Sequence, residues 1–177
     1  EYRLELREIR FDSSMLKQII QNGVPSGFQN SVIAIANVFV QSNINAFGKM
    51  AMAGCGSYSK IEGFAFLPVT CFTMALTTFV SQNLGAKQYD RAKKGARFGV
   101  LCSIAIAELI GIIIYAAAPV LITAFNRDPD VVHYGVMQSR TIALFYCLLA
   151  FSHCIAAVLR GSGNASVPMI VMLCDWC

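Results

Sequence analysis

Residues 98–126, FGVLCSIAIAELIGIIIYAAAPVLITAFN, decide the fold class of this chain. The stretch holds 29 residues, and Glu108 is the only charged one among them. A helix rises about 1.5 Å per residue, so one of this length exceeds the ~30 Å hydrocarbon core of a bilayer. A helix buried inside a soluble protein rarely runs so far without charges. The stretch therefore predicts a transmembrane helix.

Other parts of the chain are equally poor in charge. Residues 18–48 contain no Asp, Glu, Lys or Arg, and the same is true of residues 63–86. Short connections rich in Gly, Asn and Pro separate these stretches, which predicts that neighbouring helices are antiparallel. We therefore predict an all-α integral membrane protein built as an antiparallel transmembrane helix bundle. Its helices are expected at about 14–47, 50–85, 89–126, 129–161 and 165–177, the last too short to span.

The overall composition leads to the same class. Only 14% of the 177 residues are charged, whereas soluble domains average about 25%. A chain that is 56% hydrophobic cannot cover a soluble core with so few charges. Composition therefore argues against a soluble enzyme, a disordered chain and a nucleic-acid binder. We interpret the basic run at 87–97 as a loop that faces anionic lipid headgroups, with membrane lipid and no nucleic acid as partner.

The distribution of Lys and Arg predicts an orientation. Ten of them lie in residues 1–17, in the basic run or just after the fourth helix, and only Lys49 and Arg127 lie in the opposite connections. The positive-inside rule then places the residue 1 end in the cytoplasm and the chain in the cell membrane as a multi-pass protein. Residues 1–13 are expected to connect along the membrane surface. The chain does not begin with Met and its last apolar stretch is short, so we expect a piece of a longer protein.

Amide side chains form a line along the first helix. Asn30, Asn37 and Gln41 are spaced by seven and four residues, so at 100° per residue they lie within about 20° of one line. Such amides can form hydrogen bonds between helices or line a wet cavity. We favour the cavity, because one span holds more amides than packing needs.

Ionisable side chains inside the second and fourth helices come next. Tyr58, Lys60 and Glu62 lie well inside the second helix, where a charge costs several kcal/mol unless it is paired or hydrated. Arg140 lies at a similar depth in the fourth helix, about 17 Å from the helix start. We predict that Glu62 and Arg140 are near enough to pair. The alternative is that the long basic side chains extend to the outer interface.

Three further residues inside the spans could take part in transport. Glu108 stands alone in the third helix and could couple to a proton or be a neutral structural group. Tyr146 and His153 lie seven residues apart on the fourth helix, and the His is either a proton relay or a hydrogen-bond donor. The sequence contains none of the catalytic or metal-binding motifs that we searched for. We expect no enzyme activity, no metal and no cofactor beyond a coupling ion.

Several segments together resemble the multidrug and toxic compound extrusion (MATE) transporters. They are 23–27 (GVPSG), 40–48 (VQSNINAFG), 60–68 (KIEGFAFLP), 77–86 (TTFVSQNLGA) and 159–164 (LRGSGN), followed by Pro168. The resemblance implies twelve helices in two six-helix lobes, with a cavity between the lobes that opens to each side in turn. This chain would supply about four and a half helices of one lobe.

The resemblance also implies which lobe and which activity. The first helix of the N-terminal lobe usually carries an Asp where this chain has Gln41, so 14–177 resembles part of the C-terminal lobe and 1–13 the cytoplasmic connector between lobes. The missing N-terminal lobe would be its partner. The implied function is secondary active efflux of amphipathic organic cations or drugs in exchange for Na⁺ or H⁺.

Within that resemblance, the residues fall into roles. Asn30, Asn37, Gln41, Tyr58, Tyr146 and His153 would line the cavity, and Glu62 or Glu108 would couple the ion. The acids that the Na⁺-coupled branch carries on its seventh and tenth helices fall on Ile33 and Leu149 here, which moves the coupling carboxylate toward the missing lobe. Two alternatives stay open: a flippase for lipid-linked sugars from the same superfamily, and a membrane assembly subunit that transports nothing.

Overall fold

The computed structural model describes residues 12–176, and the side chains of residue 22 and of residues 172–176 are not described. The predicted connector at 1–13 therefore lies almost entirely outside the described residues. The described part of the chain is helical and contains no strand, as predicted. Its elements are α1 (Ser13–Ala46), α2 (Lys49–Ala65), α3 (Leu67–Gly85), α4 (Tyr89–Phe125), α5 (Pro129–Ala143), α6 (Tyr146–Gly161) and α7 (Ser166–Trp176).

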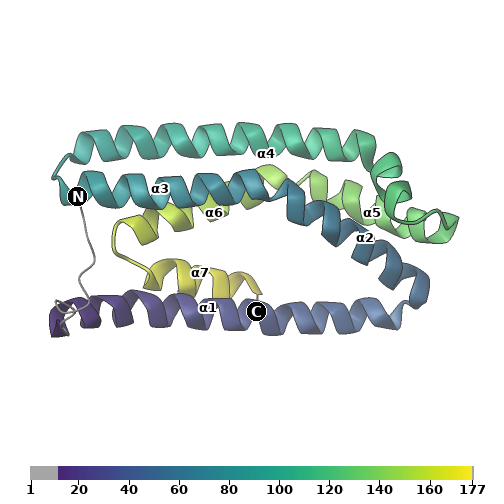
Figure 1. The fold of residues 1–177 in the computed structure, drawn as a ribbon, viewed down its shortest axis with the longest axis horizontal. Coiled ribbons are helices and arrows are strands. Elements are labelled where there is room, and N and C mark those ends of the chain that lie inside the picture. Colours follow the sequence, from purple (N-terminus) through teal and green to yellow (C-terminus); the bar gives the residue numbers. More distant parts are fainter. Residues whose placement is uncertain (1–11, 177) are drawn as a thin grey trace, which may run out of the picture.

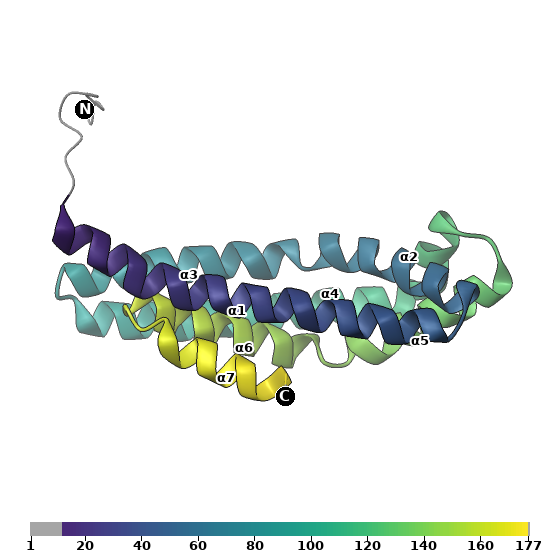
Figure 2. The ribbon, with the colours of Figure 1, turned by 90° about the horizontal axis from the view of Figure 1, so that it is seen from below.

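The helices form an elongated antiparallel bundle. In Figure 1 the helices α3, α4 and α6 run side by side, and α1 and α7 lie along the opposite edge. Helix α1 packs mainly on α7 and α2, and Figure 2 shows it crossing over the other helices with α7 next to it. Many large apolar side chains of α1 are exposed, including Ile19, Val24, Phe28, Val38 and Phe39. An apolar surface of this extent is stable against lipid or against another part of a membrane protein.

Length and apolarity identify the candidate spans. The segments Lys49–Gly85 and Tyr89–Phe125 are each 37 residues long and apolar enough to cross a membrane. The bent pair Pro129–Ala143 and Tyr146–Gly161 qualifies as a third span if it is counted as one. Helix α1 has 34 residues and is long enough, but its Asn, Gln and Ser residues keep it below the same apolarity. The prediction of four full spans therefore holds for the length of the helices but not for the apolarity of the first.

Two helices that the sequence predicts as continuous are broken. The helix expected at 50–85 is interrupted at Phe66, where α2 ends and α3 begins. Pro68 explains this break, because it lacks an N–H and its ring clashes with the carbonyl one turn earlier. The helix expected at 129–161 bends by 55° between α5 and α6. No Pro or Gly marks this second break, which occurs where α4 approaches the backbone of the chain closely: the carbonyl of Ala143 lies 2.8 Å from the position of a Cβ at Gly111.

Small residues set the distance between the helices. A Cβ on Gly54 of α2 would lie 2.7 Å from the carbonyl of Val131 and 2.9 Å from the N–H nitrogen of Gly135, both on α5. A Cβ on Gly161, at the end of α6, would lie 2.7 Å from the carbonyl of Thr77 on α3. Close backbone approach at small residues is how helices pack in a membrane, where lipid removes the hydrophobic drive between them. These contacts fix the positions of the broken helices relative to one another.

Candidate functional site

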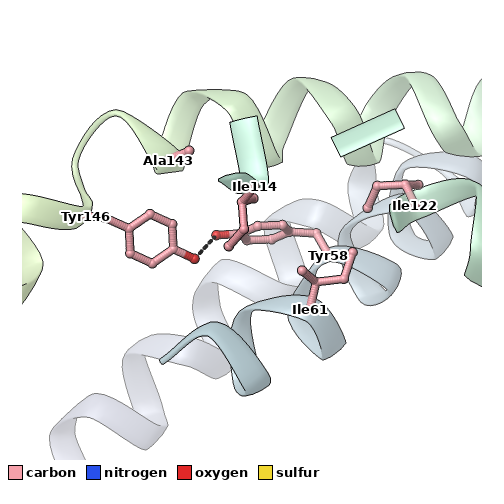
Figure 3. Close-up of a cluster of buried hydrophobic side chains, with 6 residues drawn as sticks. All are labelled: Tyr58, Ile61, Ile114, Ile122, Ala143 and Tyr146. Carbon is pink, nitrogen blue, oxygen red and sulfur yellow. Dashed lines mark hydrogen bonds between the residues drawn. The ribbon is translucent and has the colours of Figure 1, made fainter. Parts of the chain in front are cut away.

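A pair of tyrosines joins the two broken spans. The hydroxyls of Tyr58 on α2 and Tyr146 on α6 lie 3.3 Å apart in a hydrogen bond, and the two side chains are 0% and 1% exposed. Figure 3 shows the rings pointing toward each other across the helices, among Ile61, Ile114 and Ala143. Either hydroxyl can donate, and the pair satisfies two polar groups that would be costly to bury alone.

This arrangement corrects one expectation. Tyr58 and Tyr146 were predicted to line a cavity, but the structure buries both in a cluster of apolar side chains. The physical reason is that each hydroxyl finds its partner on the facing helix, so neither needs water. The sequence could show that both residues are amphipathic, but not that the two helices bring them together.

Glu62 lies one turn after Tyr58 and faces the same cluster. Its carboxyl group is within electrostatic range of the hydroxyls of both Tyr58 and Tyr146, and its side chain is half-buried. The next turn is the break: the N–H of Phe66 donates to the carbonyl of Glu62 at 2.9 Å. An acidic side chain therefore lies beside a helix interruption inside the membrane, a place where transporters commonly bind ions or substrates.

Phe66 also connects this cluster to α6. The ring of His153 meets the ring of Phe66 edge-on, with 5.0 Å between the ring centroids. His153 is half-buried. A histidine packed against an aromatic ring fits a structural role at least as well as it fits a proton relay.

One face of α6 carries polar groups along its whole length. Tyr146, His153 and Arg160 are spaced by seven residues and therefore lie on one side of the helix. They face α2 and α3: Tyr146 meets Tyr58, His153 meets Phe66, and Arg160 borders the threonines of α3. Arg160 was not among the predicted site residues. Its spacing from His153 was the signal that could have found it.

The predicted ion pair between Glu62 and Arg140 is not formed. Among the described residues, no Lys or Arg nitrogen lies within 4.0 Å of a carboxylate oxygen. The exposed guanidinium of Arg140 instead lies 5.3 Å from the ring centroid of Tyr115 on α4. Lys60 behaves in the same way, with its ammonium 5.6 Å from the ring centroid of Phe125. Both cations reach aromatic faces, where a cation is attracted by the ring quadrupole, and not the carboxylate.

Glu108 remains a solitary acid in α4. Its side chain is half-buried, and its Oε2 atom is fully buried and has no hydrogen-bond partner among the described residues. A buried oxygen without a hydrogen-bond partner is costly, so this atom is unlike the polar groups that are satisfied within the bundle.

The amide line of α1 faces outward. Asn30, Asn37 and Gln41 are all exposed, and the side-chain amide of Gln41 donates to the side chain of Asn45 at 3.0 Å. An exposed amide inside a membrane needs water or another protein surface, because lipid offers no hydrogen bond. None of these three amides lines the apolar cavity beside Val40 and Ile44.

A cavity that sequence reasoning missed lies where α1 meets α2 and α5. It has a volume of about 460 Å³ between α1, α2 and α5, and most of its walls are apolar, with Val40, Ile44, Phe47 and Met137 among them. Tyr134, Gln138 and Thr141 add polar groups, and the Oε1 atom of Gln138 is buried with no hydrogen-bond partner in the described part of the chain. A cavity of this size and character suits a drug-sized amphipathic molecule. No sequence pattern marks it, because its apolar walls look like any other lipid-facing surface.

Metal binding finds no support in the described residues. No group of three or more His, Cys, Asp or Glu side chains gathers there closely enough to hold a metal ion. The polar groups that do gather are a tyrosine pair, one carboxyl and one imidazole, which can hold water, a proton or a weakly coordinated ion.

Comparison with known proteins identifies the family. Residues 25–176 match the family model described as MatE. The chain belongs to the MatE family. The predicted resemblance to MATE transporters is therefore confirmed, and the match covers nearly all of the described helices.

Curated relatives of this MatE chain are named as transport or resistance proteins. It is 22% identical over 167 residues to "Probable multidrug resistance protein YoeA" of Bacillus subtilis, covering 94% of this chain and 36% of the relative. It is 28% identical over 158 residues to "Probable multidrug resistance protein NorM" of Thermotoga maritima, covering 89% and 34%. It is 23% identical over 170 residues to "FAD transporter" of Shewanella oneidensis, covering 96% and 37%. The chain spans about a third of the length of these relatives.

A solved structure has the same fold. A MOP superfamily transporter from Pyrococcus furiosus superposes with a TM-score of 0.85 at 18% sequence identity, over 90% of this chain and 35% of that one. The predicted fold class, an all-α membrane bundle, is confirmed by this match and by the apolar helices.

Proposed function

We propose that this MatE chain forms part of a secondary active transporter that exports amphipathic organic cations or drugs in exchange for Na⁺ or H⁺ by alternating access. The observation that carries the proposal is the placement of Glu62 beside the Tyr58–Tyr146 pair, where both broken spans meet. Broken helices near the middle of a membrane expose backbone groups and hinge points, and transporters use them to bind and to move. The curated relatives named as multidrug resistance proteins support the direction and the cargo class.

Ion coupling is assigned in this proposal to Glu62, with Glu108 as the second candidate. Both acids are half-buried and neither has an ion-pair partner among the described residues. A carboxylate without a fixed cation is free to exchange a proton or Na⁺ during a transport cycle. Glu62 is favoured because it adjoins the helix break, whereas α4 is continuous at Glu108.

Substrate binding is assigned to the exposed amides of α1 and the adjoining apolar cavity. In the complete protein, Asn30, Asn37 and Gln41 would face the cavity between this part and the missing lobe, which we take to be the N-terminal one. The apolar cavity beside Val40 and Ile44 would hold the hydrophobic part of a drug, and the unpaired Oε1 of Gln138 would accept a hydrogen bond from it. In this scheme the residue 1 end lies in the cytoplasm and the protein in the plasma membrane.

The proposal is tested by ion-driven export from liposomes that contain the full-length protein. A fluorescent organic cation such as ethidium is loaded, and a Na⁺ gradient or a pH gradient is then imposed separately. We expect one of the gradients to drive export and its collapse to stop it. An export rate that is the same with and without either gradient would contradict secondary active transport.

A second cargo class is favoured by one relative. The Shewanella oneidensis protein named as an FAD transporter bears a name that implies a phosphate-bearing cargo, as the flippase alternative also does. The same liposomes loaded with FAD distinguish the two classes. Gradient-driven export of FAD without export of ethidium would replace the cation proposal with an anionic cargo.

A further inference from the structure

Helix α6 ends in a recess at the basic end of the bundle. Figure 1 shows α6 stopping short of the neighbouring ends of α3 and α4. Gly161 packs on the carbonyl of Thr77, and the hydroxyl of Thr77 donates to the carbonyl of Ala157 at 3.1 Å. Gly85, the last residue of α3, lies eight positions after Thr77, so α6 stops about 12 Å below that end. Arg160 is therefore held inside the bundle end and not at its rim.

Arg160 borders an open cavity of about 500 Å³ in this recess. The other residues that line it are Thr73, Met74, Thr77 and Thr78, all on α3. The hydroxyls of Thr73 and Thr77 already donate to backbone carbonyls, at 2.8 Å to Thr70 and 2.9 Å to Thr73. Thr78 is exposed, and its hydroxyl makes no hydrogen bond within the described residues. The donors that remain available to a ligand are thus the guanidinium and one hydroxyl.

The charge of Arg160 has no counterpart among the residues whose side chains the structure describes. Its side chain is half-buried, and within residues 12–171 neither a carboxylate nor a hydrogen-bond acceptor pairs with it. His153, one heptad earlier on the same face, is close enough to interact with it electrostatically and adds no negative charge. A partly buried cation without a partner is costly, and intramembrane charges are normally paired or used.

We infer that Arg160 and Thr78 form a binding site for a phosphate group at the basic end of the bundle. A guanidinium presents parallel N–H donors that match two oxygens of a phosphate, and the hydroxyl can donate to a third. The recess offers donors and positive charge and no described carboxylate, so it selects an anion over a cation. The inference goes beyond the proposed export of cations and does not depend on it.

Two sources could supply the phosphate. An anionic phospholipid could place its headgroup in the recess, since the cavity is open and lies near the end of the bundle where the basic loop begins. A soluble molecule carrying a phosphate could enter the same space from the water. The chemistry that recognises both is identical, so the experiment has to separate them.

The test uses the full-length protein in detergent and in nanodiscs. Native mass spectrometry measures lipid retained from phosphatidylglycerol and from phosphatidylcholine nanodiscs, and titration with inorganic phosphate or FAD measures soluble binding. We expect Arg160→Gln to weaken the binding of one of these probes about tenfold or more, a change of about 1.4 kcal/mol. Thr78→Val should weaken it less, and Arg160→Lys should fall between the wild type and Arg160→Gln.

The matched control is Arg140→Gln, because Arg140 is also an arginine inside a span but stacks on Tyr115. It should leave the binding of phosphatidylglycerol, inorganic phosphate and FAD unchanged. Retention of phosphatidylglycerol that depends on Arg160 identifies a lipid site, and saturable binding of phosphate or FAD that depends on Arg160 identifies a soluble ligand. If Arg160→Gln does not fold, Thr78→Val and Arg160→Lys carry the test. Binding of every probe that is the same in the wild type, these variants and Arg140→Gln overturns the inference, and leaves the transport proposal untouched.

Discussion

The hydroxyl of Tyr58 on α2 and the hydroxyl of Tyr146 on α6 form a hydrogen bond of 3.3 Å between residues 88 positions apart in the chain. Both side chains are buried, and Glu62 lies within electrostatic range of both. The bond therefore ties together the two spans that are broken, at the level of the only carboxyl that adjoins either break in the described residues.

The tyrosine pair should stabilise the fold as a unit. Tyr58→Phe and Tyr146→Phe should each cost about 0.5–1.5 kcal/mol, because each leaves the other hydroxyl buried without its partner. The double variant should cost less than the sum of the two, with a coupling of about 0.6 kcal/mol as found for hydrogen bonds in membranes. Denaturant unfolding of the full-length protein in mixed micelles measures these values. The control is Tyr115→Phe, at an exposed ring, which should change the stability by less than about 0.5 kcal/mol. If the cost of the double variant equals the sum of the costs of Tyr58→Phe and Tyr146→Phe, the two hydroxyls do not interact.

Glu62 should be required for ion-driven transport and not for folding. Glu62→Gln keeps the size and the hydrogen-bonding capacity of the side chain but removes its charge. In the full-length protein we expect export of the fluorescent cation to fall at least about tenfold, with the melting temperature nearly unchanged. Glu62→Asp should retain part of the activity. The same assay on Glu108→Gln shows which of the two acids couples the ion. If Glu62→Gln exports the cation normally, with normal dependence on pH and Na⁺, Glu62 has no part in the mechanism.

The contact between Gly54 and Gly135 should tolerate no side chain. A methyl group at Gly54 would lie 2.7 Å and 2.9 Å from backbone atoms of α5, which cannot move aside without the whole helix. We expect Gly54→Ala to cost about 1–3 kcal/mol in unfolding free energy. Gly56→Ala on the same helix meets nothing within 4 Å and should be neutral or gain up to about 1 kcal/mol from helix propensity. Equal effects of the two substitutions would mean that α2 and α5 do not pack at this point.

The start of α1 should depend on pH. The carboxylate of Asp12 accepts from the N–H and the hydroxyl of Ser14, both at 2.8 Å, and from the N–H of Met15 at 3.3 Å. These bonds hold the pKa of Asp12 below its ordinary value. A lowered pKa means that the cap stabilises the helix fully above about pH 4, the value in an unfolded chain, and loses this effect as the pH falls through the folded pKa. Hydrogen exchange of the Ser14 and Met15 amides, corrected for intrinsic rates, should show this loss, whereas Asp12→Asn should show a cap that does not vary with pH.

The ends of the helices and the membrane class could be predicted from local sequence. The predicted starts and ends of the first, third and fourth helices agree with α1, α4 and the α5–α6 pair to within about one residue. Asp128 followed by Pro129 was a sufficient signal for the start of α5, because the Asp side chain caps the N–H of Asp130 at 3.0 Å. Such signals act within one turn, so they do not need the rest of the protein.

The break at Phe66 could be predicted from the sequence, whereas the break at 144–145 could not. Pro68 carries a local steric rule, whereas the second break coincides with the close approach of α4 at Gly111, a residue more than 30 positions away. The contacts of the ionisable side chains could not be predicted from the sequence either. Helical depth alone suggested that Glu62 would meet Arg140, but the rotation and crossing of the helices brought Arg140 to Tyr115 instead.

The membrane location, the helical class and the resemblance to a family could all be predicted from the amino-acid sequence, because apolar length, charge placement and short motifs are properties of contiguous residues. The packing of the helices was needed to show that Tyr58 forms a hydrogen bond with Tyr146, that Glu62 adjoins a helix break and that Arg160 has no partner within the described residues. Each of these depends on how two helices cross, and the crossing is set by close backbone contacts at residues such as Gly54, Gly111 and Gly161. A helix is rigid, so a close contact at one glycine sets the positions of side chains several turns away. No local sequence pattern shows this effect.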